Sequence, residues 1–100
     1  MAVSDTIVSF MNYGIEKTPR EIMLLLGDRI QQLRKQKKMS RENLAERSGV
    51  PAPTLRKFEQ TGIISLESLL KLVKTLGRLE EFDSMLQPND LESKRYLFDD

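Results

Sequence analysis

The chain is punctuated by residues that begin and end helices, and this feature limits its possible folds most strongly. Candidate helix starts, where a side-chain oxygen or a proline suits the first turn, lie at Thr18-Pro19, Ser40, Pro51 and Ser65. Candidate helix ends, where glycine can adopt a left-handed conformation, lie at Gly49, Gly62 and Gly77. Between them, apolar residues recur at helical spacing, and no segment reads as a strand. The sequence therefore predicts an all-α fold.

The first predicted helix runs from Pro19 to about Lys37. Thr18 and Glu21 have the spacing of a capping box, with Pro19 at the first helical position. Its apolar stripe consists of Ile22, Leu26, Ile30 and Leu33. Gly27 interrupts this pattern as a weak helix former, and it predicts either a kink or two helices run together.

Four shorter helices are predicted after it: from Ser40 to Ser48, from Pro51 to about Thr61, from Ser65 to Leu76, and from Arg78 to Leu86. Their inward-facing residues are expected to be Leu44, Val50, Leu55, Phe58, Leu66, Leu69, Leu70, Val73, Leu76, Leu79, Phe82, Met85 and Leu86. The predicted organisation is an N-terminal arm or short helix (1–18), a five-helix domain (19–87) and a short acidic and hydrophobic tail (88–100).

Composition excludes several classes of protein. The chain has no Cys and no His, so zinc fingers, disulfide scaffolds and Ser-His or Cys-His catalysis are ruled out. No carboxylate spacing suggests catalysis and no glycine-rich loop suggests phosphate binding, so we expect no enzyme activity, no metal and no cofactor. The longest apolar run, Ile22 to Leu26, is far too short for a membrane span, and no secretory signal is visible. A soluble cytoplasmic protein is expected.

Charge is unevenly distributed along the chain although the net charge is only +1. Between Asp28 and Lys57, nine basic residues face three acidic ones, a local net charge of +6. From Glu80 onward, seven acidic residues face two basic ones. A basic middle suits a polyanionic partner, although a solvated helix surface would explain the same charges.

The segments 40–50 and 51–59 carry a more specific pattern. Ser40-Arg41-Glu42-Asn43-Leu44-Ala45-Glu46-Arg47-Ser48-Gly49-Val50 resembles the first half of a helix-turn-helix motif, and Pro51-Ala52-Pro53-Thr54-Leu55-Arg56-Lys57-Phe58-Glu59 resembles its second half. With the helices on either side, residues 25–86 resemble the Xre family, the phage-repressor-like group. This resemblance implies a five-helix lambda-repressor-like domain. The 63–77 segment is also similar to the antitoxin-like branch of the family.

The resemblance implies that the third helix of the domain lies in the DNA major groove. The base-contacting positions carried over are Ala52, Pro53, Thr54 and Lys57. The expected phosphate contacts are Arg41, Arg56, Gln60 and Lys38. Arg41 stands where the family usually has Gln, which contacts phosphate and braces the recognition helix. Arg34, Lys35, Lys37 and Lys38 end the first helix, where cations suit the helix dipole and can also reach phosphates.

Three functions remain open on the sequence. The first is a sequence-specific transcriptional repressor, a homodimer on an inverted-repeat operator, nucleoid-associated in a prokaryote or acting for a phage. The second is an antitoxin that binds operator DNA and a toxin protein, for which the apolar Tyr96-Leu97-Phe98 and its acidic neighbours are a candidate contact. The third is a protein-interaction module without DNA binding, which the apolar start of the recognition helix allows.

Overall fold

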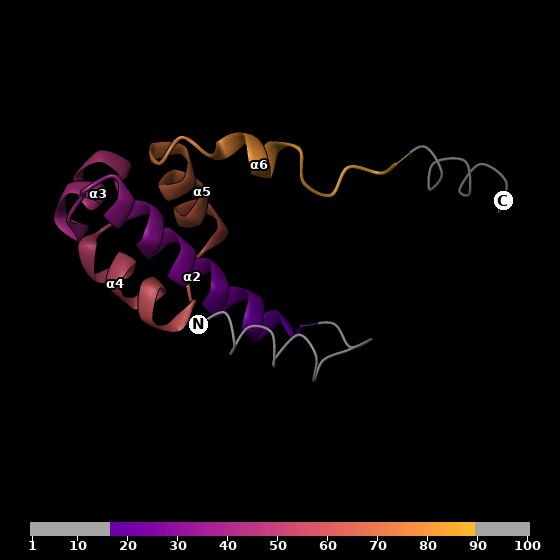
Figure 1. The fold of residues 1–100 in the computed structure, drawn as a ribbon, viewed down its shortest axis with the longest axis horizontal. Helices are drawn as coiled ribbons and strands as arrows, with labels where there is room; N and C mark the ends of the chain where they lie inside the picture. Colours follow the sequence, from indigo (N-terminus) through magenta and orange to yellow (C-terminus); the bar gives the residue numbers. More distant parts are fainter. Residues whose placement is uncertain (1–16, 90–100) are drawn as a thin grey trace, which may run out of the picture.

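The computed structural model describes residues 17–89, and every regular element in this range is a helix (Figure 1). The helices are α2 (Pro19–Gln36), α3 (Arg41–Ser48), α4 (Ala52–Thr61), α5 (Leu66–Thr75) and α6 (Leu79–Asp83). The all-α prediction is confirmed. Most of the predicted N-terminal arm and tail, including Tyr96-Leu97-Phe98, lies outside the described residues.

Helix α2 begins where the sequence predicts. The Thr18 Oγ1 accepts a hydrogen bond from the Glu21 backbone N–H at 3.1 Å, and the Glu21 Oε1 accepts one from the Thr18 N–H at 3.0 Å. The backbone and side-chain hydrogen bonds from Thr18 favour the charged carboxylate and lower the pKa of Glu21. The helix ends at a cap on Lys37, as expected.

Gly27 does not kink or divide α2, which is one continuous helix of 18 residues. Its role is to permit close packing. A Cβ at Gly27 would lie 2.5 Å from the carbonyl oxygen of Phe58 in α4. Gly62 serves the same junction from the other side, because a Cβ there would lie 2.6 Å from the carbonyl carbon of Met23. Two glycines thus let the backbones of α2 and α4 approach within contact distance.

The hydrophobic core has buried residues from α2, α3, α4 and α5, and the partly buried Phe82 of α6 packs against it. Its buried members are Ile30, Met39, Leu44, Val50, Leu55, Phe58, Leu69, Leu72, Val73 and Leu76, with Leu26, Leu33, Ile64 and Phe82 packed against them. The four residues expected between the helix-turn-helix elements, Leu44, Val50, Leu55 and Phe58, are all buried as predicted. No helix in residues 17–89 is long and apolar enough to cross a membrane.

Some expected core residues are exposed instead. Ile22 is 43% exposed, although the end of α4 packs against the backbone of its neighbour Met23. Leu66 is 66% exposed because it occupies the first position of α5, directly after the Ser65 cap. Leu72, which the predicted stripe omitted, is fully buried.

Helix α6 is shorter than predicted, since it ends at Asp83 rather than at Leu86. Leu86 has a positive φ of 63°, which is incompatible with a continuing right-handed helix, and its side chain is 91% exposed. Leu79 and Met85 are also exposed, so only Phe82 of the expected stripe packs against the core. Figure 1 shows α4 beside α2, and α6 extending away from α5 on the other side of the domain.

Candidate nucleic-acid interface

Helices α3 and α4 are joined by a short, well-defined turn. The Ser40 Oγ caps α3 by accepting a hydrogen bond from the Asn43 N–H at 3.0 Å. Gly49 ends α3 in the left-handed conformation with φ 82°, as the sequence predicts. The Val50 N–H then donates to the Ser48 Oγ at 3.1 Å, and α4 begins directly after Pro51. The two helices therefore have the layout of a helix-turn-helix.

The outer face of α4 gathers most of the predicted DNA contacts. One shallow hollow on the surface is lined by Ala52, Pro53, Arg56, Lys57 and Gln60. Neither Arg56 nor Lys57 makes an ion pair with any residue in the described range. This face therefore combines an apolar start with two unpaired cations and an amide.

Thr54 and Lys38 lie apart from this group. Thr54 is partly buried and does not line the hollow, because it lies further round the helix toward the buried Phe58. Lys38 is exposed in the turn between α2 and α3, where its φ is 57°. The structure thus brings together three of the four predicted base-contacting residues, and two of the four predicted phosphate-contacting ones.

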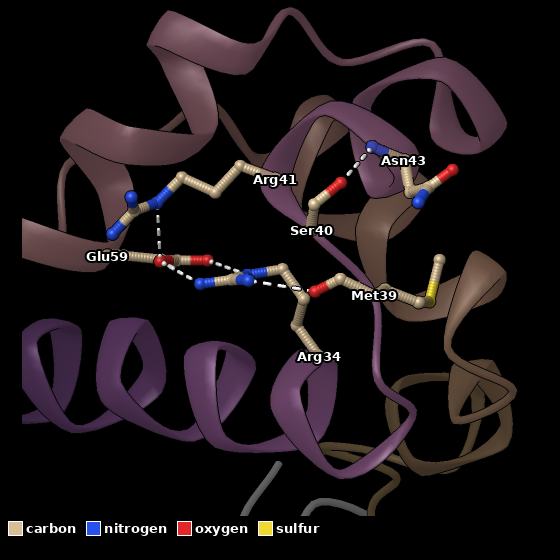
Figure 2. A network of polar contacts seen from close by, with 6 residues as sticks. All are labelled: Arg34, Met39, Ser40, Arg41, Asn43 and Glu59. Carbon is tan, nitrogen blue, oxygen red and sulfur yellow. Dashed lines mark hydrogen bonds and ion pairs between the residues drawn. The ribbon is translucent and has the colours of Figure 1, made fainter.

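The inner side of α4 carries a buried carboxylate between two arginines (Figure 2). The Glu59 side chain is only 1% exposed. From α2, Arg34 donates to it through Nε at 2.8 Å and Nη2 at 3.1 Å. From the start of α3, Arg41 donates to it through Nε at 3.0 Å. Glu59 therefore joins α4 to both α2 and α3.

The sequence interpretation missed this network. Arg34 was grouped with the solvent-facing cations at the end of α2, but it is buried, and its Nη1 also donates to the Met39 carbonyl oxygen at 2.9 Å. Glu59 received no role. The sequence did contain a signal: Glu59 directly follows the predicted core residue Phe58 in a segment rich in cations. A carboxylate buried there would require cationic or hydrogen-bonding partners.

Arg41, at the position where the resemblance implies Gln, is joined to α4. The hydrogen bond from its Nε to Glu59 supplies the link between α3 and α4. Its side chain as a whole is 27% exposed, so the same residue also reaches the surface.

A family model for helix-turn-helix domains matches residues 30–82, more than half of the chain. Neither the curated proteins nor the solved structures gave a match. The matched range contains α3, α4, α5, the Glu59 network and the outer face of α4. Members of this family are sequence-specific DNA-binding regulators rather than enzymes. The sequence match and the all-helical architecture agree that this chain belongs to the Xre-type, lambda-repressor-like family of helix-turn-helix proteins.

Proposed function

We propose that the protein is a repressor that binds an inverted-repeat operator as a homodimer, with α4 in the major groove. The observation that carries this proposal is the outer face of α4. It presents Arg56, Lys57 and Gln60 without a competing ion pair, on a helix whose inner side is fixed in the core. A rigid helix with free donors on one face is suited to reading base edges.

The chemistry of this face suggests which bases it contacts. Ala52 and Pro53 offer only apolar side-chain atoms, which suit the methyl group of thymine. Lys57 can donate to guanine O6 and N7, and Arg56 can reach a base or a phosphate. Thr54 stays in the proposed base-contacting set as a partly buried residue at the edge of the face. Arg41, Gln60 and Lys38 are proposed to contact phosphates.

The α5–α6 corner supports the proposal of a dimer. Leu79, Met85 and Leu86 are exposed large apolar side chains on and just after α6, and apolar side chains left in contact with water favour burial against a partner. Each domain covers one half-site, and two half-site centres would lie about 34–36 Å apart along the DNA. A second copy that packs through this corner would bury these residues.

A selection experiment tests DNA binding directly. Purified protein is mixed with fragmented DNA of its source organism near physiological salt, and the retained fragments are sequenced. Near-physiological salt suppresses non-specific retention by the basic surface. We expect an enriched inverted repeat. A folded protein that enriches no sequence would contradict the proposal and favour a protein-interaction role.

Two pairs of variants, each with a control, test the outer face of α4 as the DNA-binding surface and the α5–α6 corner as the dimer surface. Lys57→Ala should weaken operator binding by about 1–3 kcal/mol and relax the preference at one base pair. Lys71→Ala, which removes an exposed lysine of α5, should leave binding unchanged.

Leu86→Asp should shift the sedimentation-equilibrium mass from dimer toward monomer, whereas Leu66→Asp, at another exposed leucine, should not. If both aspartate variants remain dimeric, the α5–α6 corner is not the dimer surface.

A further inference from the structure

We infer that Glu59 is a positioning residue for DNA binding: it holds the Nε of Arg41 so that the two Nη nitrogens of the same guanidinium are presented to a DNA phosphate. This inference rests on the proposed function and adds a role for a residue that touches no DNA. It concerns the Arg41 side chain, whose Nε is hydrogen-bonded to Glu59 and whose Nη nitrogens remain available to DNA.

The first step is the division of Arg41 between two environments. Its Nε donates to the Glu59 Oε1 at 3.0 Å, while its Nη nitrogens have no hydrogen-bond partner among the described residues. In Figure 2 the dashed line from Arg41 to Glu59 starts at Nε, and no dashed line joins either Nη nitrogen to a residue drawn there. A guanidinium has five N–H donors in a planar fork, so four donors remain. Two parallel donors of this kind match the oxygens of a phosphate group.

The second step is that Glu59 itself cannot move easily. Arg34 holds it from α2 through two hydrogen bonds, and the carboxylate is almost completely buried. An exposed arginine samples many rotamers, and ordering it opposes binding. Since Glu59 already holds one nitrogen of Arg41, the ordering is done before DNA arrives.

The third step is the charge of the cluster. Two guanidiniums face one carboxylate, so one positive charge is left over. Arg34 is buried, and its Nε, Nη1 and Nη2 all donate to protein acceptors, Glu59 and the Met39 carbonyl oxygen. The excess charge therefore reaches solvent through Arg41, which is the partly exposed member of the pair. Lysine cannot replace this residue, because a single ammonium lacks the fork that serves both partners in fixed geometry.

The test is a double-mutant cycle on affinity for the operator fragment enriched in the selection above. Arg41→Ala should weaken binding about tenfold or more, as for a lost hydrogen bond to a charged group, and should lower the salt slope by about one phosphate contact. Glu59→Gln should weaken binding severalfold in the otherwise unchanged protein but have little further effect beside Arg41→Ala. An equal effect of Glu59→Gln in both backgrounds would overturn the inference, because Glu59 would then act without Arg41.

A second comparison, between two arginine-to-lysine variants, leaves the Arg34–Glu59 pair intact. It therefore tests the inference even if Glu59→Gln fails to fold. Arg41→Lys should weaken operator binding severalfold with an unchanged melting temperature. The matched variant Arg47→Lys, at an exposed arginine of the same helix, should bind like the unmodified protein. Equal affinities for the two lysine variants would contradict the shared guanidinium. Unmodified protein that binds no operator would instead contradict the proposed function itself.

Discussion

The α2–α4 junction and the α5–α6 corner are packed in opposite ways. At the junction, Gly27 and Gly62 bring backbones into contact, the Arg20 Nη1 donates to the Thr61 carbonyl oxygen, and the buried Glu59 accepts from Arg34. At the corner, α6 has only five residues, none of them buried, and no side-chain N-cap. It contacts the core through Phe82. Its ion pair, Arg78–Glu81, is exposed on both sides.

The difference separates two requirements of a DNA-binding domain. A helix that reads bases must be held in a fixed orientation, and steric contact together with buried charge pairing fixes it. A surface proposed to receive a partner must leave apolar side chains accessible, and the short α6 leaves Leu79 exposed. The same small core thus has a tightly packed junction between α2 and α4 and, at α6, exposed apolar side chains.

The largest expected effect comes from the buried ion pair. Arg34→Met leaves Glu59 buried with only Arg41 as its charge partner, so we expect the free energy of unfolding to fall by about 3–5 kcal/mol in urea denaturation. Arg78→Met removes the corresponding partner at the corner and should change stability little, because that pair is solvent-exposed. Similar losses for the two variants would show that the junction and the corner are not electrostatically different.

The next effect isolates steric contact at the junction. Gly62→Ala combines a left-handed φ of 76° with a Cβ 2.6 Å from the Met23 carbonyl carbon, and we expect a loss of about 2–4 kcal/mol. Gly77→Ala is the matched control, since its φ is also 76° but a Cβ there has no neighbour within 4 Å. It should cost about 1–2 kcal/mol. Thermal unfolding of both proteins checks this, and equal melting temperatures would refute the close-contact role of Gly62.

A smaller effect is expected at the corner. Phe82 is the partly buried link between α6 and the core, so Phe82→Ala should cost about 1–2 kcal/mol, less than the about 3–5 kcal/mol expected for Phe58→Ala. Hydrogen exchange should show the α6 amides opening well below the global free energy of unfolding. Amides of α6 that exchange as slowly as those of α4 would mean that the corner is as firmly packed as the junction.

The smallest effect concerns the first turn of α2. The pKa of Glu21 is lowered in the folded protein, so its contribution to stability is present above the ordinary glutamate pKa and is lost as the pH falls through the folded value. Glu21→Gln should therefore flatten the acid side of the stability profile slightly. Urea denaturation between neutral and acidic pH measures this, and parallel profiles for the two proteins would contradict it.

Local chemistry made much of the fold predictable from the sequence. The Thr18-Pro19 start and the Ser40 and Ser65 caps depend on contacts within a few residues. Gly49 likewise ends α3 through its own backbone conformation. These features, with the helical spacing of the apolar residues between them, were sufficient to predict five helices and the helix-turn-helix pattern.

Predictions about particular side chains depended on which other segments lie nearby. Periodicity predicted that Ile22 and Leu66 face inward, but both side chains are exposed in the folded domain. Leu86 left the predicted helix because its backbone turns to positive φ. The candidate DNA-contacting residues came from the family resemblance. Their grouping on one face follows from helix geometry, which is why Ala52, Pro53, Lys57 and Gln60 share a hollow.

The sequence by itself determined the positions of α2 to α5, the Thr18, Ser40 and Ser65 caps and the turn between α3 and α4, because those depend on neighbours along the chain. Only the tertiary structure decided that Gly27 is a packing contact rather than a break, and that Arg34 is buried rather than available to a phosphate. Only the tertiary structure showed Glu59 joining three helices. Arg34 and Glu59 are 25 residues apart, and a pairing over that distance exists only once the core has brought α2 and α4 together.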